Sequence, residues 1–324
     1  NQTTTYGNDA KVTQNKMLNN AQGTSQITFK GTEDLGGGLK ANFLFENDFD
    51  TTKDANNGTG STASFGNFGS KGGEQFLNLE GGFGKIALGA ANTPSLTTQS
   101  SSQPFGTKIG SGFGAANTGR VRNGNSIVYT SPVVAGFTFA AAYAPQSKVD
   151  AGTLATDTLS VNAAKPARNE IAAGAIADIG LLYANGPLSA GVSAYSVEAA
   201  NFTTAGNATT ASAPSKNTQT NAYVKYDLGV ATLGFGYYTE KQDVTGVATP
   251  GLTANITKLD STAYNIGAWV PLNANLSLLG SYTKKDDKTT LNYDRTVAAI
   301  GLKYTLSKNT SVYARYIDDK IDNV

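Results

Sequence analysis

Short and long connections alternate strictly along this chain, between segments that repeat apolar residues at every second position. The short connections are turns such as ANGP between Ile171–Tyr183 and Leu188–Glu198, and SKN between Thr296–Leu306 and Thr310–Asp319. The long connections are polar stretches rich in Ala, Thr and Asn, at residues 145–169, 199–216, 241–257 and 286–292. Such alternation is typical of antiparallel strands whose short turns all lie at one end of a barrel and whose long loops lie at the other.

The strands indicate lipid on the outside of that barrel. Each has one apolar face, such as Phe137, Phe139, Ala141 and Tyr143, and an opposite face of polar residues or glycine. Strands of about ten residues with Tyr or Phe near their ends are typical of transmembrane β-barrels. We therefore expect an all-β, transmembrane antiparallel barrel, and in lipid its sheet must close.

A soluble β-sandwich or β-helix is the alternative, because its strands alternate too. Three features disfavour it. The strands exceed the usual length of about 5–6 residues, the polar face offers no second apolar layer, and the long loops are larger than a sandwich needs.

The amino-acid composition limits the reactions and ligands that this chain can support. Charged residues make up 15% of the chain and 37 residues are glycine, whereas an average soluble domain has roughly 25% charged residues. The chain has no Cys and no His, which excludes thiolate catalysis and removes the commonest general base and metal ligand. We expect no enzyme activity and no cofactor. Asp286-Asp287 and Asp318-Asp319 are the candidates for weak Ca²⁺ binding in loops, but two adjacent carboxylates do not make a coordination shell, so we expect both pairs to be solvated loop ends. The net charge of +1 does not indicate a nucleic-acid partner.

One long connection interrupts the regular pattern. Ala90–Ser131 contains about thirty residues of Ser, Thr, Gly and Asn between two short strands, and a loop of this length in a compact domain is usually functional. We expect residues 1–324 to form one barrel domain in which this loop, at about residues 92–123, folds inside and narrows a water-filled hole.

Several hairpins resemble those of the general porins of Gram-negative bacteria, of the beta-proteobacterial type. The resemblance rests on KGTEDLGGGLKANFLFE (Lys30–Glu46), FLNLEGGFGKIALG (Phe76–Gly89), QPFG (Gln103–Gly106) and RVRNGNSIVYTSPVVAGFTFAAAY (Arg120–Tyr143). It implies a 16-stranded homotrimeric barrel in the outer membrane, with its third extracellular loop inside. The implied partners are the lipid bilayer, lipopolysaccharide, ions and small hydrophilic solutes.

The strand count falls short of the sixteen that this resemblance implies. Fourteen strands are visible between Thr24 and Asp319, and the other two would be the first and last. Because porins of this kind end in an aromatic residue and this chain ends IDNV, we expect truncation at both terminal strands. Alternatively, Thr3–Val12 holds a degraded strand, or the barrel has 14 strands. No signal peptide is visible at Asn1.

The resemblance also implies charges at the constriction. Relatives place arginines where this chain has Gln26, Glu74 and Ala90, whereas Arg122 matches a basic position. Strand parity puts Gln26, Thr28 and Lys30 on the inner face of one strand and Glu74, Phe76, Asn78 and Glu80 on that of another. We predict a constriction of mixed charge with weak ion selectivity, and the sequence leaves open whether cations or anions are preferred. It is formed by Lys30, Glu46, Glu74, Lys108, Arg120 and Arg122.

These features predict a channel for passive diffusion. A barrel enzyme would need a placed nucleophile or base. A structural or adhesive barrel would have a closed lumen and no long inserted loop. A substrate-specific sugar channel would have a continuous row of inward aromatic side chains, whereas those of this chain are scattered.

Overall fold

The structure is a computed structural model that describes residues 2–5, 11–14, 23–49, 73–116, 122–145, 173–199, 215–244, 259–289 and 293–322. These residues contain two short helices and sixteen strands. The elements are, in chain order, β1 (Gln2–Thr5), β2 (Lys11–Gln14), β3 (Gln26–Gly36), β4 (Leu39–Asp48), β5 (Gln75–Gly81), β6 (Gly84–Ala90), α1 (Pro94–Ser101), α2 (Phe113–Ala116), β7 (Ser126–Thr130), β8 (Phe137–Ala144), β9 (Ala173–Asn185), β10 (Leu188–Ala199), β11 (Ser215–Asp227), β12 (Thr232–Val244), β13 (Asp260–Pro271), β14 (Leu276–Asp287), β15 (Asp294–Ser307) and β16 (Thr310–Asp322).

Fourteen strands, β3 to β16, form one antiparallel sheet in which sequence neighbours are also spatial neighbours. This confirms the count made from the sequence. The segment Thr3–Val12 contributes to β1 and β2, which pair only with each other (Gln2↔Gln14 to Thr5↔Lys11). Strands of four residues are too short to cross a bilayer, which takes about 9–11. Within the described residues β3 and β16 therefore remain the sheet's two edges, and the predicted closure of the ring is not seen there.

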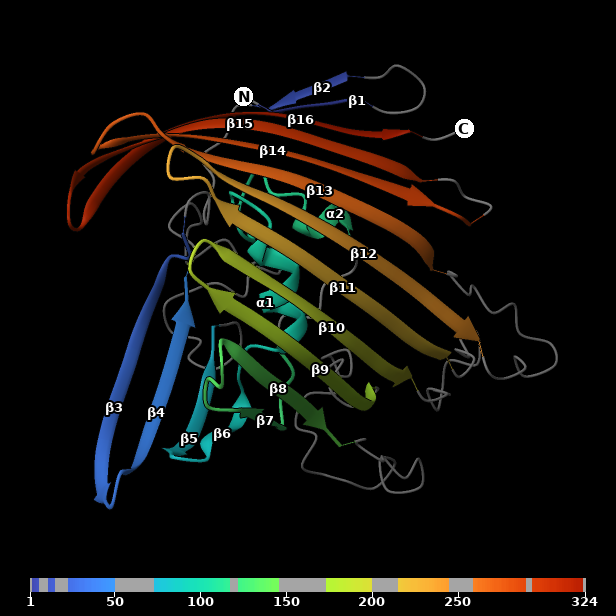
Figure 1. The fold of residues 1–324 in the computed structure, drawn as a ribbon. Helices are drawn as coiled ribbons and strands as arrows, with labels where there is room; N and C mark the ends of the chain where they lie inside the picture. Colours follow the sequence, from blue (N-terminus) through green and yellow to red (C-terminus); the bar gives the residue numbers. More distant parts are fainter. Residues whose placement is uncertain are drawn as a thin grey trace, which may run out of the picture.

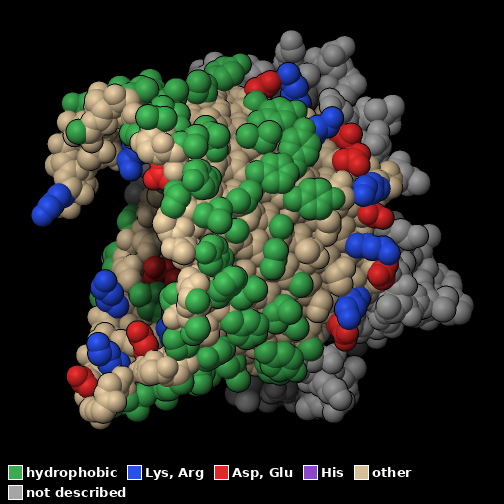
Figure 2. Space-filling view, in the orientation of Figure 1, with side chains coloured by type: hydrophobic (Ala, Val, Ile, Leu, Met, Phe, Trp, Pro, Cys, Tyr) green, Lys and Arg blue, Asp and Glu red, His purple; other side chains and the backbone are tan. Residues whose placement is uncertain are grey.

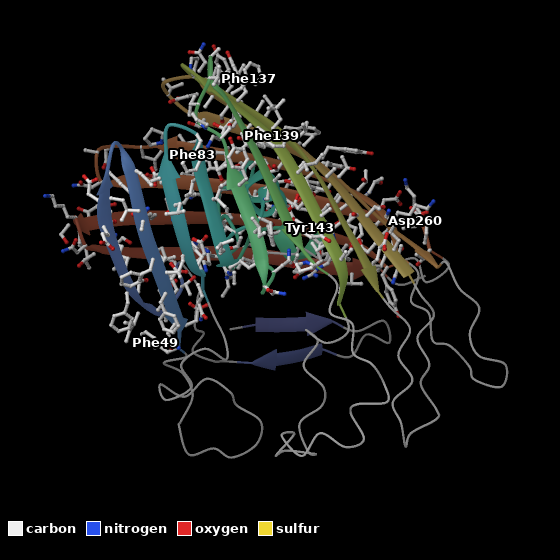
Figure 3. The ribbon with its side chains drawn as sticks, turned by 90° about the horizontal axis from the view of Figure 1, so that it is seen from below. Phe49, Phe83, Phe137, Phe139, Tyr143 and Asp260 are labelled. Atoms are coloured by element: carbon white, nitrogen blue, oxygen red, sulfur yellow. The ribbon has the colours of Figure 1, made fainter. Side chains whose placement is uncertain are left out.

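The two faces of the sheet reverse the usual pattern of a soluble protein. Apolar side chains cover the outer face, as Figure 2 shows. Along β8, Phe137, Phe139 and Tyr143 are 46%, 43% and 51% exposed (Figure 3). Polar side chains such as Asp178 and Asn265 are fully buried on the inner face. Exposed large apolar patches mark contact with a partner or a membrane, so the outer face is the lipid face that strand parity predicts.

The first hairpin turns more tightly than the sequence suggests. We expected Gly31–Gly38 to form the turn, but β3 continues to Gly36 and only the last three glycines have positive φ (84°, 62° and 82°). Gly31 instead lies within the strand opposite Phe43, where a Cβ would come within 2.4 Å of the Phe43 ring. Gly31 thus makes room for the Phe43 ring and is not part of the turn.

The sheet curves around residues 91–116, which contain α1 and α2 (Figure 1). Helix α1 contacts β8 to β12, and α2 contacts β13 to β15. Among the described residues, no helix is long and apolar enough to cross a membrane. The long segment between β6 and β7 thus lies on the concave side of the sheet.

Candidate functional site: the segment inside the sheet

Helix α1 begins with a strong local signal. The side chain of Thr93 accepts a hydrogen bond from the backbone N–H of Leu96 (3.3 Å), and Pro94 occupies the first turn. A Thr cap followed by Pro is a common helix start. A loop was predicted here and no helix was expected within it, because the segment lacks an apolar repeat. The Thr-Pro pair was the signal that could have located α1.

A buried carboxylate on the wall holds the start of α1. The backbone N–H of Ser95 donates to Oδ2 of Asp178 on β9 (3.0 Å), and the Ser95 hydroxyl donates to Oδ1 (2.7 Å). The same hydroxyl lies 3.1 Å from the hydroxyl of Ser193 on β10. Asp178 is fully buried, so these bonds provide part of the polar environment that a buried acid requires.

A tyrosine on β12 holds the end of α1. The fully buried Tyr238 hydroxyl donates to the carbonyl oxygen of Gln99 (3.1 Å) and is hydrogen-bonded to Ser102 Oγ (2.6 Å). The Gln99 amide in turn donates to the carbonyl oxygen of Phe113 (2.8 Å). One side chain of the wall is therefore linked to α1 and, through Gln99, to the start of α2.

Glycines on the wall allow the segment to approach closely. A Cβ at Gly267 of β13 would lie 2.5 Å from both the Ser102 carbonyl oxygen and Pro104 Cδ. A Cβ at Gly234 of β12 would lie 2.8 Å from the same carbonyl oxygen. Since real Cβ atoms do not come this close to backbone atoms, Ser102–Pro104 can occupy its place only because these positions are glycine.

Arg315 on β16 contacts the far part of the segment. Its Nη1 donates to the carbonyl oxygen of Ile109, and its guanidinium carbon lies 4.6 Å from the centroid of the Phe105 ring. Arg315 was not among the predicted site residues, because its partner Ile109 is 206 positions away in the sequence. The inner segment is thus fastened to the wall from β9 to β16.

The other wall carries a linked row of polar groups at the base of the segment. Gln26 Nε2 on β3 donates to Glu46 Oε1 on β4 (2.8 Å), and the backbone N–H of Glu74 donates to Glu46 Oε2 (2.7 Å). Glu74 Oε1 then accepts from the backbone N–H of Asn92 (2.9 Å), whose Oδ1 accepts from Arg122 Nη1 (2.7 Å). The structure therefore brings together three of the six predicted constriction residues: Glu46, Glu74 and Arg122.

Lys108 approaches this row from the segment. Its Nζ donates to Thr24 Oγ1 (2.5 Å), just before β3. Burial is the largest effect on the Lys108 ammonium and lowers its pKa; nearby Arg122 lowers it further, and Asp48 opposes both. Asp48, which was not among the predicted constriction residues, lies two residues beyond Glu46 on the same face. Lys30 pairs with Leu44, which is one inward-facing position nearer the short turn than Glu46. Arg120 lies outside the described residues.

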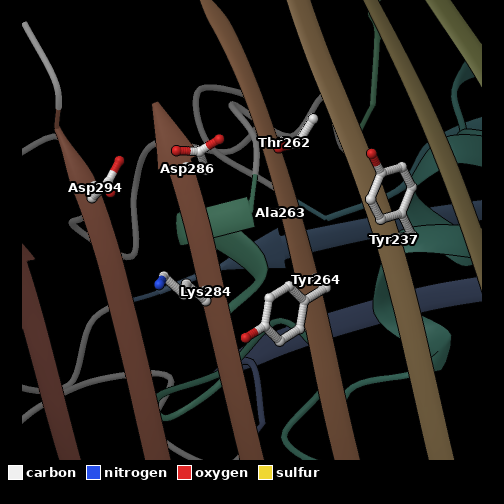
Figure 4. Close-up of a pocket in the computed structure, with 7 residues that line it drawn as sticks. All are labelled: Tyr237, Thr262, Ala263, Tyr264, Lys284, Asp286 and Asp294. Carbon is white, nitrogen blue, oxygen red and sulfur yellow. The ribbon is translucent and has the colours of Figure 1, made fainter. Parts of the chain in front are cut away.

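The outer rim at the loop ends of β10 to β16 is charged. Three ion pairs lie there: Lys216–Glu198 (3.7 Å), Lys241–Asp243 (3.2 Å) and Lys320–Asp318 (2.8 Å), and Figure 2 shows charged side chains of both signs along this rim. Beside them, Tyr237, Tyr264, Lys284, Asp286 and Asp294 line a pocket of about 260 Å³ on the outer face (Figure 4). This pocket faces away from the inner segment.

The two aspartate pairs considered for Ca²⁺ are each divided between the two faces. Asp286 faces outward opposite Thr262, whereas Asp287 lies on the inner face opposite Ser261. Asp318 and Asp319 are divided in the same way, since successive strand residues point to opposite sides. No group of three or more acidic, His or Cys side chains is placed to hold a metal in the part of the chain that the structure describes.

Comparisons with known proteins agree with this architecture. Residues 1–323 match the Gram-negative porin family. An outer membrane porin protein of Bordetella pertussis is 28% identical over 314 residues, covering 92% of this chain and 77% of the relative. Outer membrane porin protein 32 of Delftia acidovorans is also 28% identical, over 307 residues, covering 90% of this chain and 72% of the relative.

Solved structures show the same fold. The anion-selective porin from Comamonas acidovorans has a TM-score of 0.66 at 24% identity, covering 93% of this chain and 80% of that one. The trimer form of OmpT from Vibrio cholerae has a TM-score of 0.62 at 16% identity, covering 93% and 81%. One conclusion follows from the apolar outer face, from the segment held inside the sheet, and from the family match over nearly the whole sequence. The chain belongs to the Gram-negative porin family, and it is an integral outer-membrane β-barrel that forms a channel for passive diffusion.

Proposed function

We propose that the channel is a general diffusion pore for ions and small hydrophilic solutes, whose narrowest part lies between residues 91–116 and the wall of β3 to β5. The attachment of α1 through Asp178 and Tyr238 carries this proposal. A segment fixed to one side of the lumen narrows the passage without closing it. Diffusion through such a passage needs no covalent step and no cofactor.

The charges at the base of the segment support weak ion selectivity. Three carboxylates, Glu46, Asp48 and Glu74, lie near two cationic side chains, Lys108 and Arg122. Charges in a narrow, partly desolvated passage act on ions more strongly than charges in bulk water. Because the two signs nearly balance, we expect cations and anions to permeate at similar rates. Lys30 and Arg120 complete the proposed constriction.

Planar-bilayer recordings under a salt gradient test this function. The purified chain should give stable open channels with a reversal potential close to zero, and Arg122→Glu should shift that potential toward cation permeation. Lys284→Glu, which makes the same change of charge on the outer face, should leave it unchanged. An unshifted potential in Arg122→Glu channels would remove Arg122 from the constriction.

We further propose that the protein acts as a homotrimer surrounded by lipid and lipopolysaccharide. The trimer form of a structural relative supports the first part, and insertion of conductance in multiples of three would test it. The apolar outer face and the charged rim above it support the contact with lipid and lipopolysaccharide. Lipopolysaccharide carries phosphate groups, and the rim offers Lys241 and Lys320 as partners for them.

Two other functions remain as outcomes of the same recordings. Folded protein that inserts but stays silent would indicate a structural or adhesive barrel with a closed lumen. Channels that a particular sugar blocks at low concentration would indicate a substrate-specific pore.

A further inference from the structure

The inner wall carries unequal charge on the short-turn side of the inner segment. Beside that segment and from there to the short turns, β11 to β16 present three inward cations, Lys225, Lys303 and Arg315, within the described residues. The same area presents one carboxylate, Asp227, whose Oδ1 accepts a hydrogen bond from the Gly229 N–H at the turn (2.8 Å). A solute that leaves the constriction on this side therefore meets a locally positive wall.

Two of these cations lie over aromatic rings. Lys225 Nζ is 5.6 Å from the centroid of the Trp269 ring. The guanidinium carbon of Arg315 is 4.6 Å from the Phe105 centroid and 5.1 Å from the Tyr313 centroid. We call these five side chains, Phe105, Lys225, Trp269, Tyr313 and Arg315, the cation–aromatic strip. Such pairs attract because the ring face is electron-rich.

The strip faces the lumen rather than lipid. Trp269 lies on the same side of β13 as Gly267, against which Ser102 and Pro104 pack, and two residues nearer the short turn. Its ring also covers Gly234, where a Cβ would meet it at 3.0 Å. Lys225, Trp269 and Arg315 are half-buried, and Tyr313 is 41% exposed. Solutes in the lumen can therefore reach these side chains.

Strand spacing sets the distance between the two cation–ring pairs. Arg315 pairs with Gly301, Gly301 with Leu279 and Leu279 with Trp269, so three strand-to-strand steps separate Trp269 from Arg315. At about 4.8 Å per step, these two residues are roughly 14 Å apart along the wall. A single small solute thus contacts one cation and its ring at a time, and can pass from one pair to the next.

Resting on the proposed pore function, we propose that the cation–aromatic strip is a lumenal binding site for anions that carry a flat apolar part, of which aromatic carboxylates are the simplest. The carboxylate forms charge-assisted hydrogen bonds with Lys225 or Arg315. The flat part lies against Trp269 or Tyr313, since aromatic rings stack with an offset or edge to face. A small aliphatic carboxylate makes only the first of these contacts.

The single tryptophan of the chain gives a direct readout, because Trp269 is that residue. Its fluorescence should be quenched by iodide more strongly in the unaltered protein than in Lys225→Gln, by at least twofold in the quenching constant. Quenching by caesium ions should not fall in the same variant. The matched control Lys284→Gln removes a lysine from the outer face and should leave iodide quenching unchanged. Equal iodide quenching in all three proteins would overturn the proposal.

Permeability then tests the ligand class. Benzoate is larger than acetate and diffuses more slowly in water, yet it should permeate at least as fast as acetate through the unaltered channel. Trp269→Leu and Lys225→Gln should each lower the benzoate-to-acetate ratio by at least twofold. A lower permeability for benzoate than for acetate, or a ratio that neither variant changes, would refute a site for flat anions.

Recordings in potassium chloride separate this proposal from the pore function on which it rests. Protein that gives no channels in that salt contradicts the pore itself. Variants that conduct potassium chloride normally are folded, so any loss of benzoate preference in them reports on the strip.

Discussion

Replacing Asp178 by Ala should release the start of α1 from the wall. Asp178 is fully buried and accepts two hydrogen bonds from Ser95, at 3.0 Å and 2.7 Å. Hydrogen bonds to charged groups contribute about 1.5–3 kcal/mol each. Ser95 keeps its contact with Ser193 in the variant, and burying a charge offsets part of the gain. We therefore expect the attachment of α1 to weaken by about 2–4 kcal/mol.

Hydrogen exchange of the backbone amides in residues 93–102 measures this loss directly. Local opening limits exchange there, so a loss of about 2–4 kcal/mol should accelerate it roughly 30- to 1,000-fold. Amides in β14 and β15, far from Asp178, serve as the internal reference. The released segment should also fluctuate in the lumen, which open-channel recordings would detect as increased current noise.

Asp178→Asn is the matched control, because it keeps the shape of the side chain and one oxygen acceptor. Its exchange rate should fall between those of the unaltered protein and Asp178→Ala. If residues 93–102 of Asp178→Ala exchange within about threefold of the unaltered rate, equivalent to roughly 0.6 kcal/mol, Asp178 does not hold the segment. The attachment would then depend on Tyr238 and on the close packing around Pro104.

Further outcomes are expected elsewhere in the molecule. Gly267→Val should push Ser102–Pro104 away from the wall, because even a Cβ would lie 2.5 Å from Pro104, and single-channel conductance should fall. Burial lowers the pKa of Lys108, so on raising the pH this ammonium should lose its charge before exposed lysines do. Cation permeability should therefore rise over that pH interval, and Lys108→Gln should abolish the step in reversal-potential titrations. Ile300→Arg, on the outer face at 51% exposure, should lower the free energy of unfolding in lipid vesicles by about 2–4 kcal/mol, whereas Ile300→Leu should change it little.

Strand parity was predictable because it is a local property. A period of two assigns every residue of a strand to a face once one residue is assigned. The prediction that Asn78 faces inward is confirmed by its exposure of 8%, whereas its strand neighbours Leu77 and Leu79 are 65% and 46% exposed on the outer face. The same reasoning placed Glu74 on the inner wall, where its backbone N–H donates a hydrogen bond to Glu46.

The residues that hold the inner segment were not predictable in this way. Ser95 and Asp178 are 83 positions apart, and Ser102 and Tyr238 are 136 apart. Parity gives the face of Asp178 and Tyr238 but not the height at which the segment meets them. That height depends on how each strand is shifted against the next around the whole sheet, which no short stretch of sequence specifies.

Helix α1 was missed for a reason that also explains how it is held. Helices are usually recognised by an apolar stripe that packs against an apolar core. The buried side of α1 instead consists largely of polar residues, including Ser95, Thr98 and Gln99, because the wall that it faces is the polar inner face of a membrane barrel. Apolar burial therefore contributes little to its position, and directional hydrogen bonds to buried groups such as Asp178 and Tyr238 determine it. Since such bonds are lost with small displacements, the segment should have one well-defined position, which a pore of fixed conductance requires.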